Sequence, residues 1–219
     1  MDIPNFPHAQ FDVTKGFGFL AHYYPHDALK DEELSIEQWR FQSYSPEILN
    51  YKEGQLHHIA YFKKPFLKLI ETALASTKRK NAILVPVPSS IKHDDPSFSQ
   101  VPRKKGDKRN RDDRNVVFCK GLSLANPNLT LADILVRVKS KPQKATWTAS
   151  EHAKSLTINQ ETAPGSGFSG VFILVDDVCT KGGTIYGAKK VLGEAYGAST
   201  IVMLTLGLSK DPAQFQPVG

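Results

Sequence analysis

One stretch of the chain shows the clearest change in its hydrophobic pattern. Five apolar residues in succession, Val171 to Val175, predict a short buried strand that begins after Gly170. A polar loop follows, and from Thr184 onward apolar residues recur with the spacing of one helix face, at Ile185, Ala188, Val191, Leu192 and Ala195. The pattern therefore predicts a strand, a glycine-containing loop and a helix in direct succession.

The same patterns predict further elements. Apolar residues on one face favour a helix over residues 65–75, and Thr148 and Glu151 form a capping box for a helix that runs to about Asn159. Other expected helices cover residues 34–42 and run from 110 or 111 to 125, and expected strands cover residues 82–87 and 131–139. We therefore expect an α/β protein.

The loop between the central strand and its helix has the residue types of a phosphate-binding turn. A helix N-terminus presents unpaired N–H groups and about half a positive charge. Gly182 and Gly183 let backbone amides approach phosphate oxygens, because no Cβ stands in the way. The hydroxyls of Thr180 and Thr184, together with Lys181, can complete the cradle.

Two carboxylates, Asp176 and Asp177, directly follow the predicted strand. They can accept hydrogen bonds from vicinal sugar hydroxyls, or hold Mg²⁺ through water, since Mg²⁺ prefers oxygen ligands. A site that takes phosphate at one end and hydroxyls at the other fits a ribose 5-phosphate. The alternative is an ordinary aspartate-capped βα turn. We rank proton abstraction by either carboxylate below binding, because such a carboxylate should have a low pKa and be a weak base.

Composition narrows the classes of protein that fit. The chain has 219 residues, of which 40% are hydrophobic and 23% charged, so a folded protein is expected, with one sizeable α/β domain and additions or with two small domains. A net charge of +6 suits an anionic ligand or nucleic acid. The two cysteines, Cys119 and Cys179, exclude a disulfide framework and a Cys-rich zinc site. The longest apolar stretch, residues 201–208, is too short to span a bilayer, so we expect a cytoplasmic protein without a membrane partner.

Residues 1–58 are rich in aromatic side chains and contain five histidines. The aromatic residues are most simply a small core packed on the main domain, residues 59–219. No histidine spacing matches a metal-ligand pattern, so surface or capping roles are favoured over a metal site.

Two further segments are candidates for contact with an anionic ligand. The strand over residues 82–87 ends in a Pro-Ser-Ser loop with Ser89, and ligands of open α/β sheets lie beyond the carboxyl ends of strands. The basic run 103–114 has three interpretations: a nucleic-acid contact, a solvated loop or a pyrophosphate grip. We favour pyrophosphate binding, through Arg109 and Arg111, because a guanidinium group can donate two hydrogen bonds to one phosphate. Base-stacking aromatic residues are absent within the run.

Residues 172–185 resemble the PRPP (phosphoribosyl pyrophosphate) signature of type I phosphoribosyltransferases, in which apolar residues precede Asp-Asp and then Thr-x-Gly-x-Thr. The chain departs from it at Lys181, where a small hydroxyl residue is more usual, and at Cys179. The resemblance implies transfer of phosphoribosyl from PRPP to a nitrogen acceptor with release of pyrophosphate. The implied ribose and Mg²⁺ ligands are Asp176 and Asp177. The implied 5′-phosphate ligands are Thr180, Lys181, Gly182, Gly183 and Thr184.

Over roughly residues 45–206, the order of segments is similar to the ComF branch of that family, without its N-terminal zinc ribbon. The similar segments are VPVP, a basic Lys-Gly loop before Asn110, Arg137-x-x-x-Lys141-Pro142-Gln143 and a Ser-x-x-x-Ala-x-x-Leu helix before Asn159. The resemblance implies a doubly wound, mostly parallel sheet whose final strand covers residues 199–206. It also implies a hood from residues 1–58, from the tail after Gly207, or from both. The expected pyrophosphate contacts are Ser89, Arg109, Arg111 and Lys141.

Three functions from different classes stay open. The first is a phosphoribosyltransferase, and the second is a non-catalytic module that senses PRPP or a nucleotide. The third is a nucleic-acid-associated protein on the same fold, which would use residues 103–114. Pyrophosphate release separates the first from the second, and steep salt dependence of binding identifies the third. A homodimer is a further candidate assembly.

Overall fold

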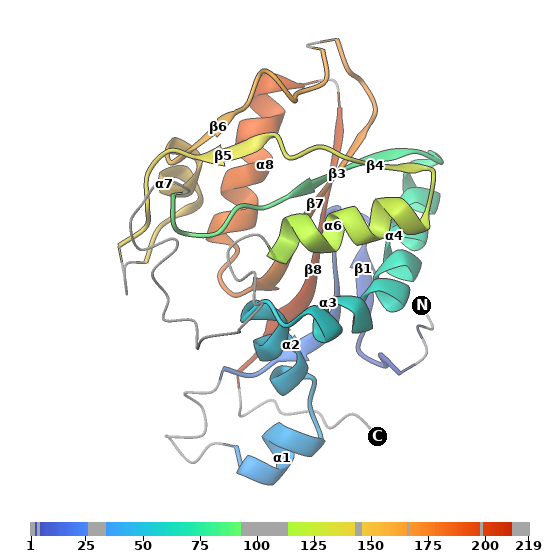
Figure 1. The fold of residues 1–219 in the computed structure, drawn as a ribbon, viewed down its shortest axis with the longest axis vertical. Coiled ribbons are helices and arrows are strands. Elements are labelled where there is room, and N and C mark those ends of the chain that lie inside the picture. Colours follow the sequence, from blue (N-terminus) through green and yellow to red (C-terminus); the bar gives the residue numbers. More distant parts are fainter. Residues whose placement is uncertain are drawn as a thin grey trace.

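The computed structural model describes residue 3 and residues 5–25, 34–92, 114–142, 146–165, 167–197 and 199–211 (Figure 1). The strands are β1 (Gln10–Asp12), β2 (Phe17–Tyr23), β3 (Ala82–Pro86), β4 (Leu129–Leu131), β5 (Leu135–Arg137), β6 (Leu156–Ile158), β7 (Val171–Cys179) and β8 (Thr200–Ser209). The helices are α1 (Ile36–Phe41), α2 (Ser45–Lys52), α3 (Leu56–Tyr61), α4 (Lys63–Thr77), α6 (Arg114–Ala125), α7 (Ala149–Lys154) and α8 (Gly183–Ala195).

A six-stranded sheet in the order β1-β2-β8-β7-β3-β4 forms the centre of the described protein. The β1–β2 pair is antiparallel, and the other neighbouring pairs run parallel. A separate antiparallel pair, β5 and β6, lies outside this sheet. The expected α/β class with a mostly parallel sheet is therefore confirmed.

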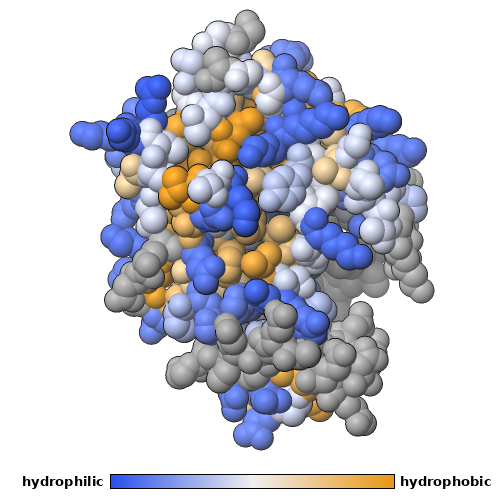
Figure 2. All heavy atoms as spheres, turned by 180° about the vertical axis from the view of Figure 1, so that it is seen from behind, coloured by the Kyte–Doolittle hydropathy of each residue, from blue (hydrophilic) through white to orange (hydrophobic). Residues whose placement is uncertain are grey.

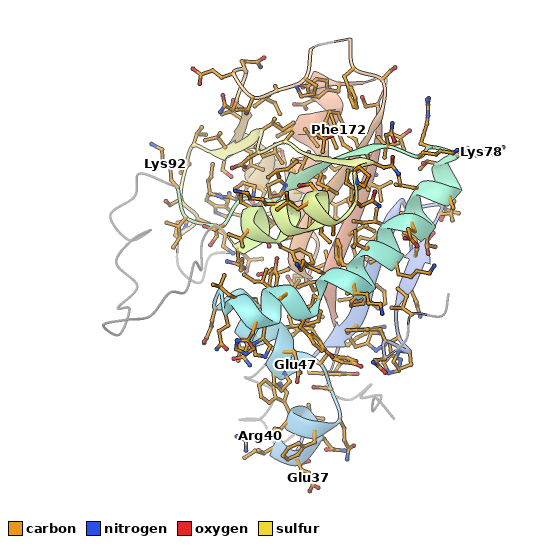
Figure 3. All side chains as sticks on the ribbon, turned by 45° about the vertical axis from the view of Figure 1, so that its right-hand side comes forward. Glu37, Arg40, Glu47, Lys78, Lys92 and Phe172 are labelled. Carbon is orange, nitrogen blue, oxygen red and sulfur yellow. The ribbon has the colours of Figure 1, made fainter. Side chains whose placement is uncertain are left out.

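Helices cover both faces of the sheet, as a doubly wound fold requires. Along β7, Ile173 belongs to the same buried cluster as Phe118 of α6, and this cluster also takes in residues of α2 and α4. The neighbouring residue Phe172 belongs to a second cluster with Ile185 of α8. Because successive strand residues point to opposite faces, the two clusters lie on opposite sides of the sheet. Phe172 is labelled within the upper part of Figure 3.

The central sheet includes residues that the sequence analysis assigned to an N-terminal extension. β2 pairs with β8 from Phe17 opposite Met203 to Tyr23 opposite Ser209. Nearly all of β2 is buried, so its sequence FGFLAHY lacks the polar alternation that marks a half-buried strand. The division at residues 58 and 59 stays a prediction, but strands from before it are part of the sheet.

Two predicted elements differ from the structure between residues 129 and 158. The strand expected over residues 131–139 is instead two short strands, since the chain leaves the sheet after β4 and pairs with β6 as β5. The helix expected to reach Asn159 begins at the predicted capping box but ends at Lys154. Leu-Thr-Ile then forms β6, as suits its β-branched residues.

Helix α1 lies at the far end of the molecule from β5 and β6 (Figure 1), and Figure 3 labels Glu37 and Arg40 on it. The helix predicted over residues 34–42 is confirmed, with a capping box between Ser35 and Gln38. Trp39 donates from Nε1 to the carbonyl of Tyr24 at 2.9 Å, which ties α1 to the end of β2. None of the helices in the described ranges is long and apolar enough to cross a membrane.

Candidate functional site

The acidic pair lies inside β7 and not after it, because the strand continues to Cys179. Asp176 is in register with Thr205 of β8, and both carboxylates are buried, with exposed fractions of 8% for Asp176 and 6% for Asp177. Apolar burial alone had indicated the strand's first five residues, so its polar end was missed. The two carboxylates have different partners.

Asp177 is held in an ion pair with Arg114 at the start of α6. The Nε of Arg114 donates to Oδ2 of Asp177 at 3.0 Å, and Nη2 donates to the same oxygen. The backbone N–H of Val178 donates to Oδ1 at 2.6 Å. Burial alone would raise the pKa of Asp177, but the charges of Arg114 and Lys52 lower it below its usual value. Asp177 is therefore an ionised carboxylate that joins α6 to β7.

The groups around Asp176 stabilise a negative charge less than those around Asp177 do. Its Oδ1 accepts from the backbone N–H of Asp177 at 2.9 Å and from Nδ2 of Asn115 at 3.4 Å. Burial, followed by the charge of Asp177, raises the pKa of Asp176 above its usual value. The low pKa expected for both carboxylates is thus found for Asp177 alone in the ligand-free protein. The pair divides into one structural anion and one carboxyl group able to hold a proton.

Asn115 is hydrogen-bonded to Asp176 of the acidic pair, and the sequence analysis did not predict this contact. Its Nδ2 donates to the carbonyl of Val87 at 2.9 Å, and its Oδ1 accepts from the hydroxyl of Tyr51 at 3.0 Å. Both Asn115 and Tyr51 are buried. This residue therefore connects α2, the end of β3 and the end of β7. The sequence signal was a polar residue between Arg114 and the apolar residues 116–119 of α6.

The loop after β7 needs glycine for its backbone as well as for any ligand. Gly182 has φ of +77°, a left-handed conformation that L side chains rarely adopt. A Cβ on Gly183 would lie 2.7 Å from the carbonyl oxygen of Trp147. Gly182 therefore permits the left-handed turn into α8, and Gly183 lets α8 begin close to the segment before α7. Helix α8 starts at Gly183, as the pattern predicted from Thr184 onward.

A cavity of about 230 Å³ joins most of the described residues predicted to contact a ligand. It is lined by Lys141, Thr146, Trp147, His152, Asp176, Val178, Cys179, Thr180, Lys181, Gly182, Gly183, Thr184 and Ile185. Asp177 is not among these lining residues, in keeping with its ion pair to Arg114. The structure therefore places the loop, one carboxylate and Lys141 around one space.

The segment after β3 lies against the segment after β5. Arg137 donates from Nε to the carbonyl of Ser89 and from Nη1 to Oγ of Ser155 at 2.7 Å. The backbone N–H of Lys141 donates to the carbonyl of Ser90 at 2.8 Å. Burial lowers the pKa of Arg137 to about 10, so it stays a cation near neutral pH. Ser89 and Lys141, predicted from distant segments, are brought to neighbouring loops by this buried arginine.

The other predicted cations lie mostly outside the described residues. Arg109 and Arg111 are outside them, as is the rest of the basic run up to residue 113. Arg114, the last residue of that run, is committed to Asp177. The proposed nucleic-acid contact therefore does not extend to Arg114.

His152 of α7 is a cavity residue that the sequence did not reveal. Its Nε2 lies 3.5 Å from Oγ1 of Thr184, and its ring meets that of Trp147 edge-on with centroids 5.4 Å apart. Burial, followed by the charge of Arg137, lowers the pKa of His152 to about 4. A neutral imidazole therefore supports the phosphate-loop side of the cavity.

The donor set fits a hard cation better than a transition metal. No cluster of three or more His, Cys, Asp and Glu side chains occurs in the part of the chain that the structure describes. Asp176 offers a carboxylate to the cavity, and Thr180 lines the same cavity with a hydroxyl oxygen. Mg²⁺ is usually bound by one or two carboxylates together with substrate phosphates, so these residues suit it.

Comparison with known proteins gives likenesses to solved structures only. No family model matches the chain, and no curated protein matches it. An adenine phosphoribosyltransferase is 14% identical, with 71% of this chain and 74% of that chain covered and a TM-score of 0.41. The Saccharomyces cerevisiae adenine phosphoribosyltransferase, complexed with D-2,5-dideoxy-2,5-imino-altritol 1,6-bisphosphate and adenine, is 15% identical (69% and 70% covered; TM-score 0.38). The Leishmania tarentolae adenine phosphoribosyltransferase is 13% identical (93% and 95% covered; TM-score 0.37).

These likenesses are too distant to assign a chemistry to the protein, so its chemistry has to be inferred from the residues of the site. The class that the described residues define is an α/β protein with a mostly parallel sheet and a polar cavity at the carboxyl end of β7. The resemblance to the ComF branch stays a prediction.

Proposed function

We propose that the protein binds PRPP with Mg²⁺ and transfers its phosphoribosyl group to a nitrogen acceptor, with release of pyrophosphate. One observation carries this proposal. A single cavity at the carboxyl end of β7 brings the buried Asp176 together with the loop Thr180–Thr184 and with Lys141. Carboxylate, phosphate cradle and cation are the three kinds of group that ribose, 5′-phosphate and pyrophosphate need.

The start of α8 supplies the phosphate end. The first N–H groups of a helix have no partner within it, so those at the start of α8 suit phosphate oxygens. The hydroxyls of Thr180 and Thr184 line the same space, and Lys181 adds a charge. His152 lies beside Thr184 and would orient its hydroxyl toward the bound phosphate.

Asp176 is the group expected to meet the ribose. Its carboxylate would accept hydrogen bonds from the ribose hydroxyls and would also ligate Mg²⁺. The metal would neutralise part of the charge on the pyrophosphate that leaves. Asp177 would not contact the ligand. Its ion pair with Arg114 would hold the end of β7, and with it Asp176, in place.

The transfer is a displacement at ribose C1. The acceptor nitrogen forms a bond to C1 with its lone pair as the bond from C1 to the pyrophosphate oxygen breaks. The electron pair of the broken C1–O bond leaves with pyrophosphate. The proton lost from nitrogen goes to solvent, because a carboxylate that ligates Mg²⁺ and accepts hydrogen bonds from ribose is a weak base. Asp176 would therefore serve in binding. Lys141 and the neighbouring Ser89 loop would stabilise the negative charge that gathers on pyrophosphate.

The test is release of pyrophosphate from PRPP and Mg²⁺ in the presence of a panel of purine, pyrimidine and amine acceptors. We expect release that depends on one class of acceptor and falls at least about tenfold in Thr184→Val, which removes one hydroxyl from the cradle. Thr130→Val, an exposed threonine on β4, is the matched control and should keep full activity. Binding of PRPP without release by any acceptor would contradict turnover and favour a sensing module.

A further inference from the structure

A second hollow lies on the other side of the phosphate loop. Its volume is about 410 Å³, within the range typical of small-molecule sites. It is lined by Gln10, Asp12, Lys15, Phe17, Phe19, Cys179, Thr180, Lys181, Gly182, Tyr186 and Leu208. It shares Cys179 to Gly182 with the first cavity, but Asp176 is not among its lining residues. An occupant would therefore touch the loop without reaching the acidic pair.

The walls of the second hollow are aromatic. Phe17 and Phe19 come from β2, with ring centroids 6.3 Å apart, and Tyr186 comes from the first turn of α8. Tyr186 keeps 39% of its surface exposed although it is a large apolar side chain. Figure 2 shows the face turned away from the viewer in Figure 1, where hydrophobic surface lies between hydrophilic side chains. Phe17 is half-buried and Phe19 is buried, so Phe17 and Tyr186 are the rings that a planar ligand could stack on.

The rim of the second hollow is cationic on balance. Lys15 and Lys181 oppose a single carboxylate, Asp12. Lys15 pairs with that carboxylate at 3.2 Å, and the same carboxylate accepts from the hydroxyl of Thr14 at 2.6 Å, so the net positive charge of the rim is that of Lys181. Lys181 is exposed at the junction of the two cavities. An anionic group on the ligand would therefore be favoured at the rim.

We propose that the second hollow binds a planar aromatic heterocycle carrying an anionic group, of which a mononucleotide is the simplest example. The ring lies against Phe17 and Tyr186, and the anion lies near Lys181, with the Lys15–Asp12 pair at the same rim. This ligand is not the reacting acceptor, because the loop separates it from Asp176. It would act on the loop through Tyr186, whose ring packs so closely on Gly182 that a Cβ there would lie 2.5 Å from it.

The test is calorimetric titration with adenosine 5′-monophosphate in the presence of saturating ribose 5-phosphate, which lacks the ring and carries the phosphate that the proposed cradle of the first cavity would take. We expect one nucleotide bound per chain, at least about tenfold weaker in Tyr186→Ala and in Phe17→Ala, because base–aromatic stacking is lost. Tyr186 is partly exposed, so its replacement keeps the test valid if Phe17→Ala folds poorly. Lys15→Glu should weaken binding, while Lys120→Glu, with the same charge change on α6, should not.

The other outcomes overturn the proposal. The absence of nucleotide binding, or binding unaffected by both aromatic variants, would show that the second hollow is not the site. Binding that only Asp176→Asn abolishes would place the nucleotide in the first cavity alone. Adenosine binding as tightly as its monophosphate would contradict the anionic part of the ligand class. The proposal rests on the second hollow and does not depend on phosphoribosyl transfer.

Discussion

Arg114 donates from Nε to Oδ2 of Asp177 at 3.0 Å, and the two side chains keep only 13% and 9% of their surface exposed. The ion pair makes the two adjacent carboxylates unequal. Asp177 is committed to α6, whereas Asp176 lines the cavity with the phosphate loop. The site thus uses one carboxylate to hold the end of β7 in place and leaves the other for a ligand.

The first prediction concerns this ion pair. Arg114→Met leaves a buried carboxylate without its partner, so the free energy of unfolding should fall by about 3–5 kcal/mol. Urea denaturation measures the change. The double variant Arg114→Met, Asp177→Asn should lose less than the two single variants together. Lys68→Met, which removes an exposed ion pair with Glu71, should cost less than about 1 kcal/mol, and equal losses at both pairs would contradict the account.

Asn115 gives a second prediction. Asn115→Ala leaves the hydroxyl of Tyr51 and the carbonyl of Val87 without their partner, so it should lower the free energy of unfolding by about 2–3 kcal/mol. Tyr51→Phe removes only one of these bonds and should cost about 1 kcal/mol. Chemical denaturation of both variants checks the order, and a larger loss in Tyr51→Phe would refute it.

A matched pair of glycines on α8 provides the third prediction. A Cβ on Gly187 would lie 2.6 Å from Cβ of His152 and 2.9 Å from the carbonyl oxygen of Ala149. Gly187→Ala should therefore push α7 away and destabilise the protein by about 1–3 kcal/mol. Gly193→Ala meets only Ile201 at 3.9 Å and should stabilise the helix by up to about 1 kcal/mol. Thermal unfolding should shift in opposite directions, and a shared direction would contradict the packing described.

The dependence of stability on pH is the fourth prediction. Burial lowers the pKa of His22 and of His152 to about 4, so both are neutral in the folded protein at neutral pH. The unfolded chain takes up protons on these rings below about pH 6.5, so the stability from the neutral rings is complete above that pH and is lost toward pH 4. The loss should be about 1–2 kcal/mol for each ring, since partial solvation screens it.

Denaturation at a series of pH values checks this loss. The variant with both His22→Gln and His152→Gln should show a flatter decline between pH 7 and pH 4 than the original protein. His57→Gln, at an exposed position of α3, is the control and should leave the slope unchanged. Equal slopes in all three proteins would show that the two buried histidines do not cause the loss of stability toward pH 4.

The central part of the fold could be predicted because its signals are local. The apolar run of β7, the glycines before α8 and the capping box at Thr148 each determine structure within a few residues. β2 escaped prediction because its aromatic residues are buried on both faces and lack a period. The break between β4 and β5 also escaped, because it depends on pairing with β6 and not on residues 131–139 themselves.

The candidate site was predictable to the extent that it is contiguous in sequence. Asp176 and the loop residues share one segment, and the cavity unites them. Arg114, Asn115 and His152 come from α6 and α7, and only the packing of those helices shows their contacts with the acidic pair and Thr184. The sequence Asp-Asp does not predict that the two pKa values differ, because the difference depends on burial and on an arginine distant in the sequence.

The most direct test of the central claim is calorimetric titration of the protein with PRPP in the presence of Mg²⁺. We predict one site per chain, whose affinity falls at least about tenfold in Asp176→Asn, because the ribose and Mg²⁺ lose a carboxylate. Asp176→Asn keeps the Arg114 ion pair intact, and Glu161→Gln, at an exposed position, is the charge-matched control that should bind normally. No heat at millimolar PRPP, or equal binding by Asp176→Asn, would contradict a phosphoribosyl site at the end of β7.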